Sequence, residues 1–429
     1  MILLRFRRFF NDLAFSGGSS VLFQGSTLLF TLLASNAFGP EGLARVYITQ
    51  NTLNTLSSVL QAGLGYTALT QIARYRRADP VFASGIANLC LKSSFAIGCA
   101  GAVILFCGMG LLAERLYGEA AAYPYLGLAA LALPFSAVGL VQIGVLNGLE
   151  KFKDVFANAV VSSLVLLGGG AALGFLFGPF GAALGIVAAA LVRSIQFLWM
   201  IRRALPVEDP GAVRPAIRDI WGKVSRFAIP AGLAGLTLTP ATWLTSGFLA
   251  NSRGLTELGI FSAIIAIKSA VAFVPQQIGT VLLPRYMNLE TGSALSPPQF
   301  MLRFLGLVFL ASGLLATLFI VFGTTVMGFF GSKFVEGLPA LKWMMAAVVL
   351  ESLASAASHV MARRERMWHL LMFYTVPKDL VLVALAFWFI PKFGMTGLGM
   401  AYFGSWALAF AMIGILAALH GHSRRALRA

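Results

Sequence analysis

Apolar runs long enough to cross a lipid bilayer recur from one end of this 429-residue sequence to the other. A helix of about 20 apolar residues spans the hydrocarbon core, and only short polar stretches separate these runs. The runs lie at residues 16–38, 45–69, 82–112, 123–149, 155–177, 180–201, 223–249, 257–283, 301–327, 338–362, 367–390 and 395–420. The sequence therefore predicts an all-α, polytopic membrane protein with about twelve transmembrane helices.

Composition supports lipid as the solvent for most of the chain. The sequence is 58% hydrophobic and only 11% charged, whereas soluble domains carry about 25% charged residues. A chain with so few charged side chains cannot cover a water-facing surface of this size.

The basic residues predict the orientation, because Lys and Arg near helix ends are retained on the cytoplasmic face. With the N-terminus inside, 23 of the 32 basic residues fall at cytoplasmic span ends and 6 on the opposite face, and the last three, Arg193, Lys268 and Lys378, lie within spans. One helix more or fewer would move every later loop to the opposite side of the membrane, and the basic residues would no longer gather on one side. We therefore expect both termini to be cytoplasmic.

The net charge of +16 raises the question of a nucleic-acid partner. The basic residues are dispersed over the loops between spans rather than gathered in one soluble domain, so anionic membrane lipids are the better explanation and no nucleic acid is expected. The three cysteines, Cys90, Cys99 and Cys107, all fall in the third span without a CxxC pattern. We expect buried thiols, no metal site and no cofactor.

A proline-rich segment divides the chain into halves. The expected domains are a basic cytoplasmic segment (1–15), an N-terminal lobe of six spans (16–201), a cytoplasmic linker (202–222), a C-terminal lobe of six spans (223–420) and a cytoplasmic tail (421–429).

The halves also repeat. Phe180-Gly181 recurs as Phe393-Gly394 (393 − 180 = 213), residues 150–153 match 363–366 at the same offset, and residues 39–47 correspond to about 254–261. Because six spans is an even number, both copies keep one orientation. We expect two pseudo-symmetric six-helix lobes around a central cavity.

Polar residues gather on one face of each of the first two spans. Ser20, Gln24, Thr27 and Thr31 share a helical face in the first span, and the second carries Gln50, Asn51, Asn54, Ser57, Ser58 and Gln61. Such groups need partners in hydrocarbon. An interhelical hydrogen-bond seam and a wet cavity both supply them; we favour the seam for Ser and Thr and the cavity for the amides. The substrate-binding candidates are Gln24, Gln50, Asn51, Asn54 and Gln61, and amides suit a ligand rich in hydroxyls, such as a sugar.

Two buried cations are further substrate-binding candidates. Lys268 lies near the middle of the eighth span, and an intramembrane lysine marks a functional site by default. Its alternative role is a structural ion pair, for which only Glu351 and Asp379 lie at mid-membrane depth. Arg193 lies nearer the cytoplasmic end of the sixth span, where an arginine can also reach the interface along its helix.

Glu351, Asp379 and Lys378 are candidates for ion coupling. Adjacent residues on a helix point about 100° apart, so Lys378 need not pair with Asp379, and a Lys378–Glu351 pair between helices is equally plausible. Structural pairing and a proton- or ion-coupling role both remain open.

Several short motifs resemble the polysaccharide and oligosaccharide flippases of the multidrug/oligosaccharidyl-lipid/polysaccharide superfamily. The resemblance covers nearly the whole chain, although each motif is loose. It rests on Gly39-Pro40-Glu41-Gly42 with Tyr47, Gly63-Leu64-Gly65 before Ile72-Ala73-Arg74, Val145-Leu146-Asn147-Gly148-Leu149-Glu150-Lys151-Phe152, Phe180-Gly181-Ala182-Ala183, Phe227-Ala228-Ile229-Pro230, Leu258-Gly259-Ile260-Phe261 and Leu283-Pro284-Arg285.

The resemblance implies a function. It implies a two-lobe cavity, formed mainly by spans one, two, seven and eight, that moves polyprenyl-pyrophosphate-linked sugar units from the cytoplasmic to the periplasmic leaflet of the bacterial inner membrane. Alternating access and ion antiport are implied with it, as are polysaccharide polymerase or assembly proteins as partners. A pyrophosphate needs a cation in the cavity, because an unpaired anion does not enter a low-dielectric path.

Two other functions are weighed against this one. A drug or cation extruder of the same superfamily would hold an acid within the N-terminal lobe, but every Asp and Glu before residue 202 lies at a span end or in a loop. A membrane enzyme of polysaccharide assembly, a polymerase or ligase, would need a sizeable external loop or paired acids. The external loops are short, so we expect no enzyme.

Overall fold

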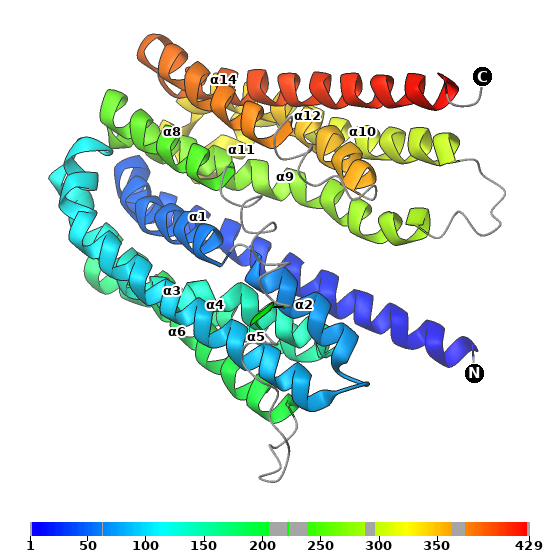
Figure 1. Ribbon diagram of the computed structural model, residues 1–429. Coiled ribbons are helices and arrows are strands. Elements are labelled where there is room, and N and C mark those ends of the chain that lie inside the picture. Colours follow the sequence, from blue (N-terminus) through cyan, green and yellow to red (C-terminus); the bar gives the residue numbers. More distant parts are fainter. Residues whose placement is uncertain are drawn as a thin grey trace. The chain divides into compact units, whose positions relative to one another are not determined.

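The protein is helical throughout the part of the chain that the structure describes. The computed structural model describes residues 2–61, 63–205, 221–222, 238–287, 297–362 and 374–426, and its regular elements are helices joined by short turns (Figure 1). The long helices are α1 (Ile2–Leu60), α2 (Leu64–Tyr75), α3 (Pro80–Arg115), α4 (Tyr123–Gly148), α5 (Phe152–Leu164), α6 (Gly170–Ala204), α8 (Leu238–Arg253), α9 (Leu255–Met287), α10 (Pro297–Val321), α11 (Gly323–Phe330), α12 (Leu338–Ala362) and α14 (Val376–Ala426). Short turns of helix complete the set: 3₁₀ turns at Ala120–Ala122 and Ser332–Gly337, and a π-helical turn at Val165–Gly169 that joins α5 to α6.

The predicted number of membrane spans agrees with these helices. Eight of the described helical stretches are long and apolar enough to cross a membrane. Three of them, Gly17–Leu60, Phe152–Ala204 and Val376–Ile415, are broken internally at Gly39, Gly178 and Gly394. Each break makes two spans of one stretch, which gives eleven. The remaining predicted span, at residues 223–249, is described only from residue 238 on, as α8. The all-α fold of about twelve spans is thus confirmed.

The chain forms two compact units, Met1–Trp243 and Leu244–Ala429. Their boundary falls inside α8. Residues 206–220 of the predicted linker lie outside the described residues, so the lobe and linker boundaries drawn from the sequence stay predictions.

Single glycines form the turns on the predicted external side. Gly39, Gly118, Gly178, Gly254, Gly331 and Gly394 all have positive φ angles, a region that costs an L-residue with a Cβ but not glycine. A proline follows Gly39 and Gly178 at the first position of the next helix segment, where its missing N–H leaves no hydrogen bond unmade. At Gly39, Gly178 and Gly394, one residue thus reverses the chain while the backbone stays helical on both sides.

These glycines also repeat between the halves. Gly39 and Gly254 are 215 residues apart (254 − 39 = 215), Gly118 and Gly331 are 213 apart (331 − 118 = 213), and Gly178 and Gly394 are 216 apart (394 − 178 = 216). The backbone geometry therefore pairs Gly394 with Gly178. The sequence match paired Gly394 with Gly181, which lies three residues further along the chain. Residues 363–366 of the second predicted match lie outside the described residues.

The second predicted span is interrupted. The hydropathy pattern predicts one run over 45–69, but α1 ends at Leu60 and α2 begins at Leu64. Gly63, with φ of 84°, breaks the helix there. A hydropathy pattern cannot detect a helix break that lies between two apolar segments. The side chain of Gln61 accepts a hydrogen bond from the backbone N–H of Leu140 at 3.1 Å, which ties the break to α4.

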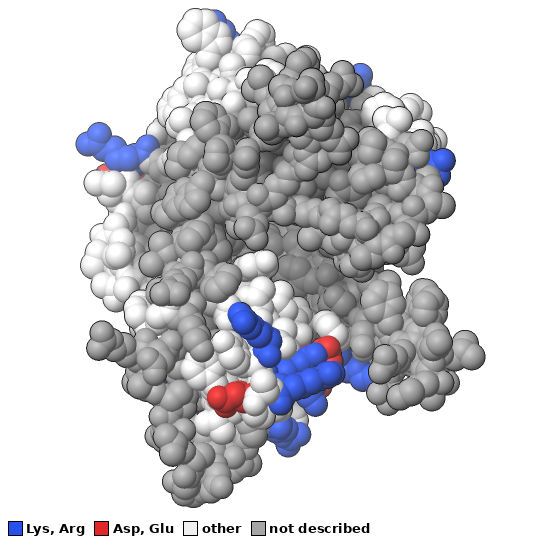
Figure 2. Space-filling model, turned by 45° about the vertical axis from the view of Figure 1, so that its right-hand side comes forward, with Lys and Arg blue, Asp and Glu red and all other residues white. Residues whose placement is uncertain are grey.

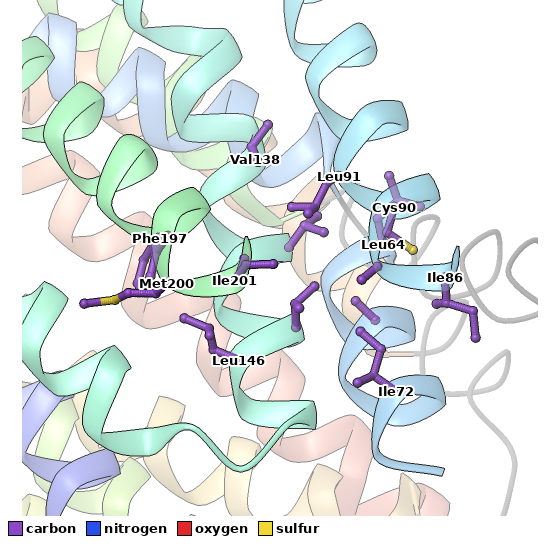
Figure 3. Close-up of a cluster of buried hydrophobic side chains, with 14 of the residues drawn as sticks. Leu64, Ile72, Ile86, Cys90, Leu91, Val138, Leu146, Phe197, Met200 and Ile201 are labelled. Carbon is purple, nitrogen blue, oxygen red and sulfur yellow. The ribbon is translucent and has the colours of Figure 1, made fainter. Parts of the chain in front are cut away.

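Close backbone packing follows this break. A Cβ added at Gly144 of α4 would collide with the carbonyl oxygen of Gly65 in α2, so both helices need glycine to approach this closely. Beside this crossing, α2, α3, α4 and α6 pack around a buried apolar cluster that includes Ile72, Cys90 and Phe197 (Figure 3).

The Gly144→Ala substitution should test this crossing. Overpacking of a tight contact typically costs about 1–3 kcal/mol, so the purified full-length variant should unfold at a lower temperature than the unsubstituted protein. Gly108→Ala in α3 is the matched control, because a Cβ there meets nothing within 4 Å. Equal melting temperatures for the two variants would contradict the packing described.

Candidate functional site

The first unit holds a half-buried cation in Arg193 of α6. Arg193 lies 15 residues after the Gly178 break (193 − 178 = 15) and 11 before the helix end at Ala204 (204 − 193 = 11), so its Cα is about 16 Å from that end. Its guanidinium carbon lies 5.0 Å from the ring centre of Phe23 in α1 and 5.9 Å from that of Phe197. Among the described residues, the ion pairs do not include Arg193.

Two amide side chains hold the turn of α6 that carries Arg193. Asn158 of α5 donates to the backbone oxygen of Arg193 at 3.0 Å and to Oε1 of Gln196 at 3.1 Å. Gln142 of α4 donates to the backbone oxygen of Ser194 at 2.9 Å. Both amides are 1% exposed. Sequence analysis missed them because isolated amides without a stripe give no pattern.

The hydroxyls of the first-span stripe bond to their own helix. Thr27 Oγ1 donates to the backbone oxygen of Phe23 at 2.9 Å, and Thr31 Oγ1 donates to that of Thr27 at 2.8 Å. Back-bonding to the preceding turn satisfies a hydroxyl without a neighbouring helix or water, so these two need neither a seam nor a cavity. Gln24, on the same face, is half-buried.

The second-span amides are in different environments. Gln61 is buried and engaged with α4, as described above. Asn51 is half-buried, and its Nδ2 is buried without a hydrogen-bond partner among the described residues. Gln50 is half-buried and Asn54 is exposed. Asn51 therefore has a buried donor that is unpartnered among the described residues.

In the second unit, Lys268 of α9 pairs with Glu351 of α12. Lys268 Nζ lies 2.6 Å from Glu351 Oε2, and the two side chains are 16% and 14% exposed. The ammonium also lies 5.7 Å from the ring centre of Tyr402. The ion pair that the sequence left open for Lys268 is formed, so its charge is already offset in this conformation.

Lys378 pairs with its neighbour Asp379 at the start of α14. The Lys378 ammonium contacts Asp379 Oδ1 and lies 4.5 Å from the ring centre of Trp406. Of the two pairings that the sequence allowed, the structure contains the one within the helix, and Glu351 is paired with Lys268 instead. Tyr402 and Trp406 are four residues apart on the second segment of α14, so one helical face supplies a ring to each lysine.

The predicted cytoplasmic turn after α4 carries an exposed ion pair. Arg76, just beyond α2, pairs with Glu150 and donates to the backbone oxygen of Gly148 at 3.3 Å. The hydrogen bond from Arg76 lowers the pKa of Glu150 below its ordinary value. Glu150 has a positive φ of 58°. On the face shown in Figure 2, Lys and Arg side chains gather in a group with acidic side chains beside it.

Metal-ligand clusters are not found among the described residues, where no three His, Cys, Asp or Glu side chains come together. Cys90, Cys99 and Cys107 are free thiols; Cys90 is buried, Cys99 intermediate and Cys107 exposed, so the expectation of buried thiols is wrong for Cys107.

Comparison with known proteins decides the family. The family model described as "Polysaccharide biosynthesis protein" matches residues 13–290, more than half of the chain. The chain belongs to this polysaccharide biosynthesis protein family. It is similar to the Lipid III flippases of Escherichia coli (strain K12) and Shigella flexneri, each 23% identical over 420 residues that cover 92% of this chain and 95% of the relative.

Solved structures share the fold of this polysaccharide biosynthesis family member. An inward closed structure of the Lipid II flippase MurJ has a TM-score of 0.73 at 11% identity, covering 93% of this chain and 86% of that one. An inward-facing multidrug resistance transporter of the MATE family, from the MOP superfamily, has a TM-score of 0.70 at 18% identity and covers 93% and 94%. The similarity establishes a multi-pass transporter fold.

The Lys268–Glu351 pair gives a stability prediction. Lys268→Leu leaves the Glu351 carboxylate without its cation, and breaking a buried pair from one side costs about 3–5 kcal/mol, so the full-length variant should melt at a clearly lower temperature. Lys268→Leu combined with Glu351→Leu should recover most of this loss. Lys342→Leu, an exposed lysine of α12, controls for added apolar surface. A double variant no more stable than the single one would mean that the two residues do not act as a pair.

Proposed function

We propose that this protein is a flippase that moves polyprenyl-pyrophosphate-linked oligosaccharide units from the cytoplasmic to the periplasmic leaflet in surface polysaccharide biosynthesis. The polysaccharide biosynthesis family and the end-to-end similarity to Lipid III flippases support the reaction. The transporter fold supports alternating access between two lobes and a transporter rather than an enzyme.

The observation that carries the proposal is the half-buried side chain of Arg193, whose guanidinium lies against two aromatic rings without a carboxylate beside it in the described residues. A pyrophosphate can enter a path of low dielectric only where a cation offsets its charge. Arginine binds phosphate oxygens with two parallel N–H donors. Arg193 is a cation of the first unit that has no ion pair among the described residues, whereas Lys268 could bind the headgroup only in a state in which Glu351 releases it.

The glycan is assigned to the half-buried or exposed amides Gln24, Gln50, Asn51 and Asn54. Sugars present hydroxyl groups that both donate and accept, and an amide supplies both partners. The unpartnered Nδ2 of Asn51 is the donor best placed for this role. Gln61, already bonded to α4, contributes by fixing the helix break.

The site of action is the inner membrane of a bacterium, with both termini cytoplasmic. The distribution of 23 basic residues on one side and 6 on the other supports this orientation, and the curated relatives are bacterial. Anionic lipids of the cytoplasmic leaflet and polysaccharide polymerase or assembly proteins are the proposed partners.

A cation extruder of the same superfamily is the second candidate, since multidrug transporters share the fold. A cationic drug would need a buried acid in the first unit. The acids whose side chains are described there, Glu41, Asp79, Glu114, Glu119, Glu150 and Asp154, all lie within a turn or two of a helix end or break. The half-buried cation Arg193 therefore favours an anionic cargo.

Replacing Arg193 tests the proposal. In cells that depend on this chain for export, Arg193→Ala should lower surface polysaccharide by roughly ten- to a hundredfold, because a hydrogen bond to a charged group contributes about 1.5–3 kcal/mol. Lipid-linked oligosaccharide should accumulate on the cytoplasmic leaflet, and Arg193→Lys should retain part of the export.

Arg202→Ala, an exposed arginine at the end of the same helix, is the control and should export normally. Normal export by Arg193→Ala at wild-type abundance would remove Arg193 from the site. If cells lacking the protein accumulate no lipid-linked oligosaccharide but lose efflux of a cationic dye, the extruder is the correct function.

A further inference from the structure

Each outer turn of the second unit carries a cation close to its turn glycine, where outer means the predicted external side of the membrane. The three cations are Arg253 next to Gly254, Lys333 two residues after Gly331 and Lys392 two residues before Gly394. All three are exposed, as is Lys342 near the start of α12. We call these four residues the outer cation surface.

The three turns adjoin one another around the start of α9. Glu257, in the first turn of α9, accepts a hydrogen bond from the backbone N–H of Met395 at 2.6 Å. Arg253 donates to two backbone oxygens just before the same turn of α14. A Cβ added at Gly337, at the end of the 3₁₀ turn, would lie 2.5 Å from a methyl carbon of Ile260. The four cations therefore belong to one continuous end of the unit.

The fold does not need these cations, because the first half lacks them. Counting from the matched turn glycines, the positions equivalent to Arg253 (253 − 215 = 38), Lys333 (333 − 213 = 120), Lys342 (342 − 213 = 129) and Lys392 (392 − 216 = 176) are Phe38, Ala120, Ala129 and Leu176. All of them are uncharged. The residues that lie within two positions of a turn glycine there include two acids, Glu41 and Glu119.

The outer cation surface is on the side where few cations are expected. Lys and Arg near span ends are retained on the cytoplasmic face, so a group of them on the opposite face needs a separate explanation. The ion pairs among the described residues include none of the four. With the acids Glu257 and Glu336, this end of the second unit has a net positive charge (4 − 2 = +2), whereas two cations and three acids make the outer side of the first unit negative (2 − 3 = −1).

Exposed aromatic rings accompany the cations. Lys392 Nζ lies 4.2 Å from the ring centre of Trp388, and Trp388 is 65% and Phe393 52% exposed. Trp343, directly after Lys342, is 36% exposed. Exposed Trp side chains of membrane proteins are typical of the interface, where the ring sits at the depth of the lipid headgroups. This depth favours a lipid phosphate over a water-soluble acidic partner.

We propose that the outer cation surface binds the phosphate groups of anionic phospholipids in the outer leaflet of the membrane. Each lysine donates from its ammonium to phosphate oxygens, which gives charge-assisted hydrogen bonds. Arg253 adds positive charge while it also holds the turn of α14. Anionic lipids thus hold the outer end of the second unit at headgroup depth, whereas the acidic outer turns of the first unit repel them.

Crosslinking can identify the lipid at this surface. The full-length protein, with the photocrosslinking residue p-benzoylphenylalanine in place of Phe393, is reconstituted in liposomes of equal parts phosphatidylglycerol and phosphatidylcholine. Crosslinked phosphatidylglycerol should exceed phosphatidylcholine by about fivefold or more, because each Lys or Arg near an anionic lipid surface contributes about fivefold in affinity. Mass spectrometry of the crosslinked peptide measures the ratio.

Phe177 is the matched control position. It directly precedes Gly178 as Phe393 precedes Gly394 (393 − 216 = 177), and it is 61% exposed. The same crosslinker there should give no excess of phosphatidylglycerol, because the outer side of the first unit is negative. Equal ratios at the two positions, or no excess of phosphatidylglycerol at Phe393, would overturn the proposal.

Charge variants test whether the cations select the lipid. Lys333→Gln, Lys342→Gln and Lys392→Gln combined should lower the ratio at Phe393 about fivefold or more. The same three lysines replaced by arginine should keep the ratio, because the charge is retained. Arg115→Gln, which removes an exposed cation from the outer side of the first unit, should leave it unchanged. A ratio that survives the combined glutamine variant would contradict binding by these cations.

Lipid binding does not rest on the proposed flippase activity, although the leaflet rests on the orientation proposed with it. Cells without the protein that accumulate no lipid-linked oligosaccharide would refute the flippase and leave the crosslinking ratio unaffected. A crosslink in cells that holds mainly a polyprenyl pyrophosphate or a protein would overturn the phospholipid surface and leave the flippase standing.

Discussion

Every backbone N–H and C=O group in the hydrocarbon core must find its partner within the chain, and this structure depends on that constraint. It explains why the described spans are helices and why they continue almost unbroken through the predicted external turns. At Gly39, Gly178 and Gly394 one residue of positive φ reverses the chain. Such turns leave few backbone N–H and C=O groups without a partner in the chain. They can therefore lie close to the lipid boundary, because few groups need hydrogen bonds from water.

Buried side-chain charge is distributed unequally over this repeated framework. The first unit contains the arginine whose guanidinium lies against Phe23, and the position equivalent to it in the second half is Ala409 (193 + 216 = 409). The second unit contains two ion pairs, Lys268–Glu351 and Lys378–Asp379. Both halves share one fold, so the fold itself does not require charges that only one half contains. A separate role for Arg193 and for the two ion pairs explains their presence better. A half-buried cation with no carboxylate beside it in the described residues suits the anionic headgroup proposed above.

Neutral polar groups serve the framework more than the sequence suggests. The hydroxyls of Thr27 and Thr31 return to their own helix, and Gln61 fixes the break before α2. Asn158 and Gln142, which form no stripe, hold the turn that carries Arg193. A polar residue in a span therefore indicates function only when one of its donors or acceptors has no hydrogen-bond partner in its own helix or in neighbouring helices. Asn51 is such a residue among those described.

The sequence by itself determined the helical class, the number of spans and the two-fold repeat, because hydropathy and basic-residue distribution report directly on the lipid environment. It also identified the ionisable residues within the spans, since any charge in an apolar run is conspicuous. Only the tertiary structure decided that Lys268 pairs with Glu351, that Lys378 pairs with Asp379 and that Arg193 lies against aromatic rings. Those partners come from different helices or from a choice of rotamer, and neither spacing nor composition along one chain specifies which groups meet across a helix interface.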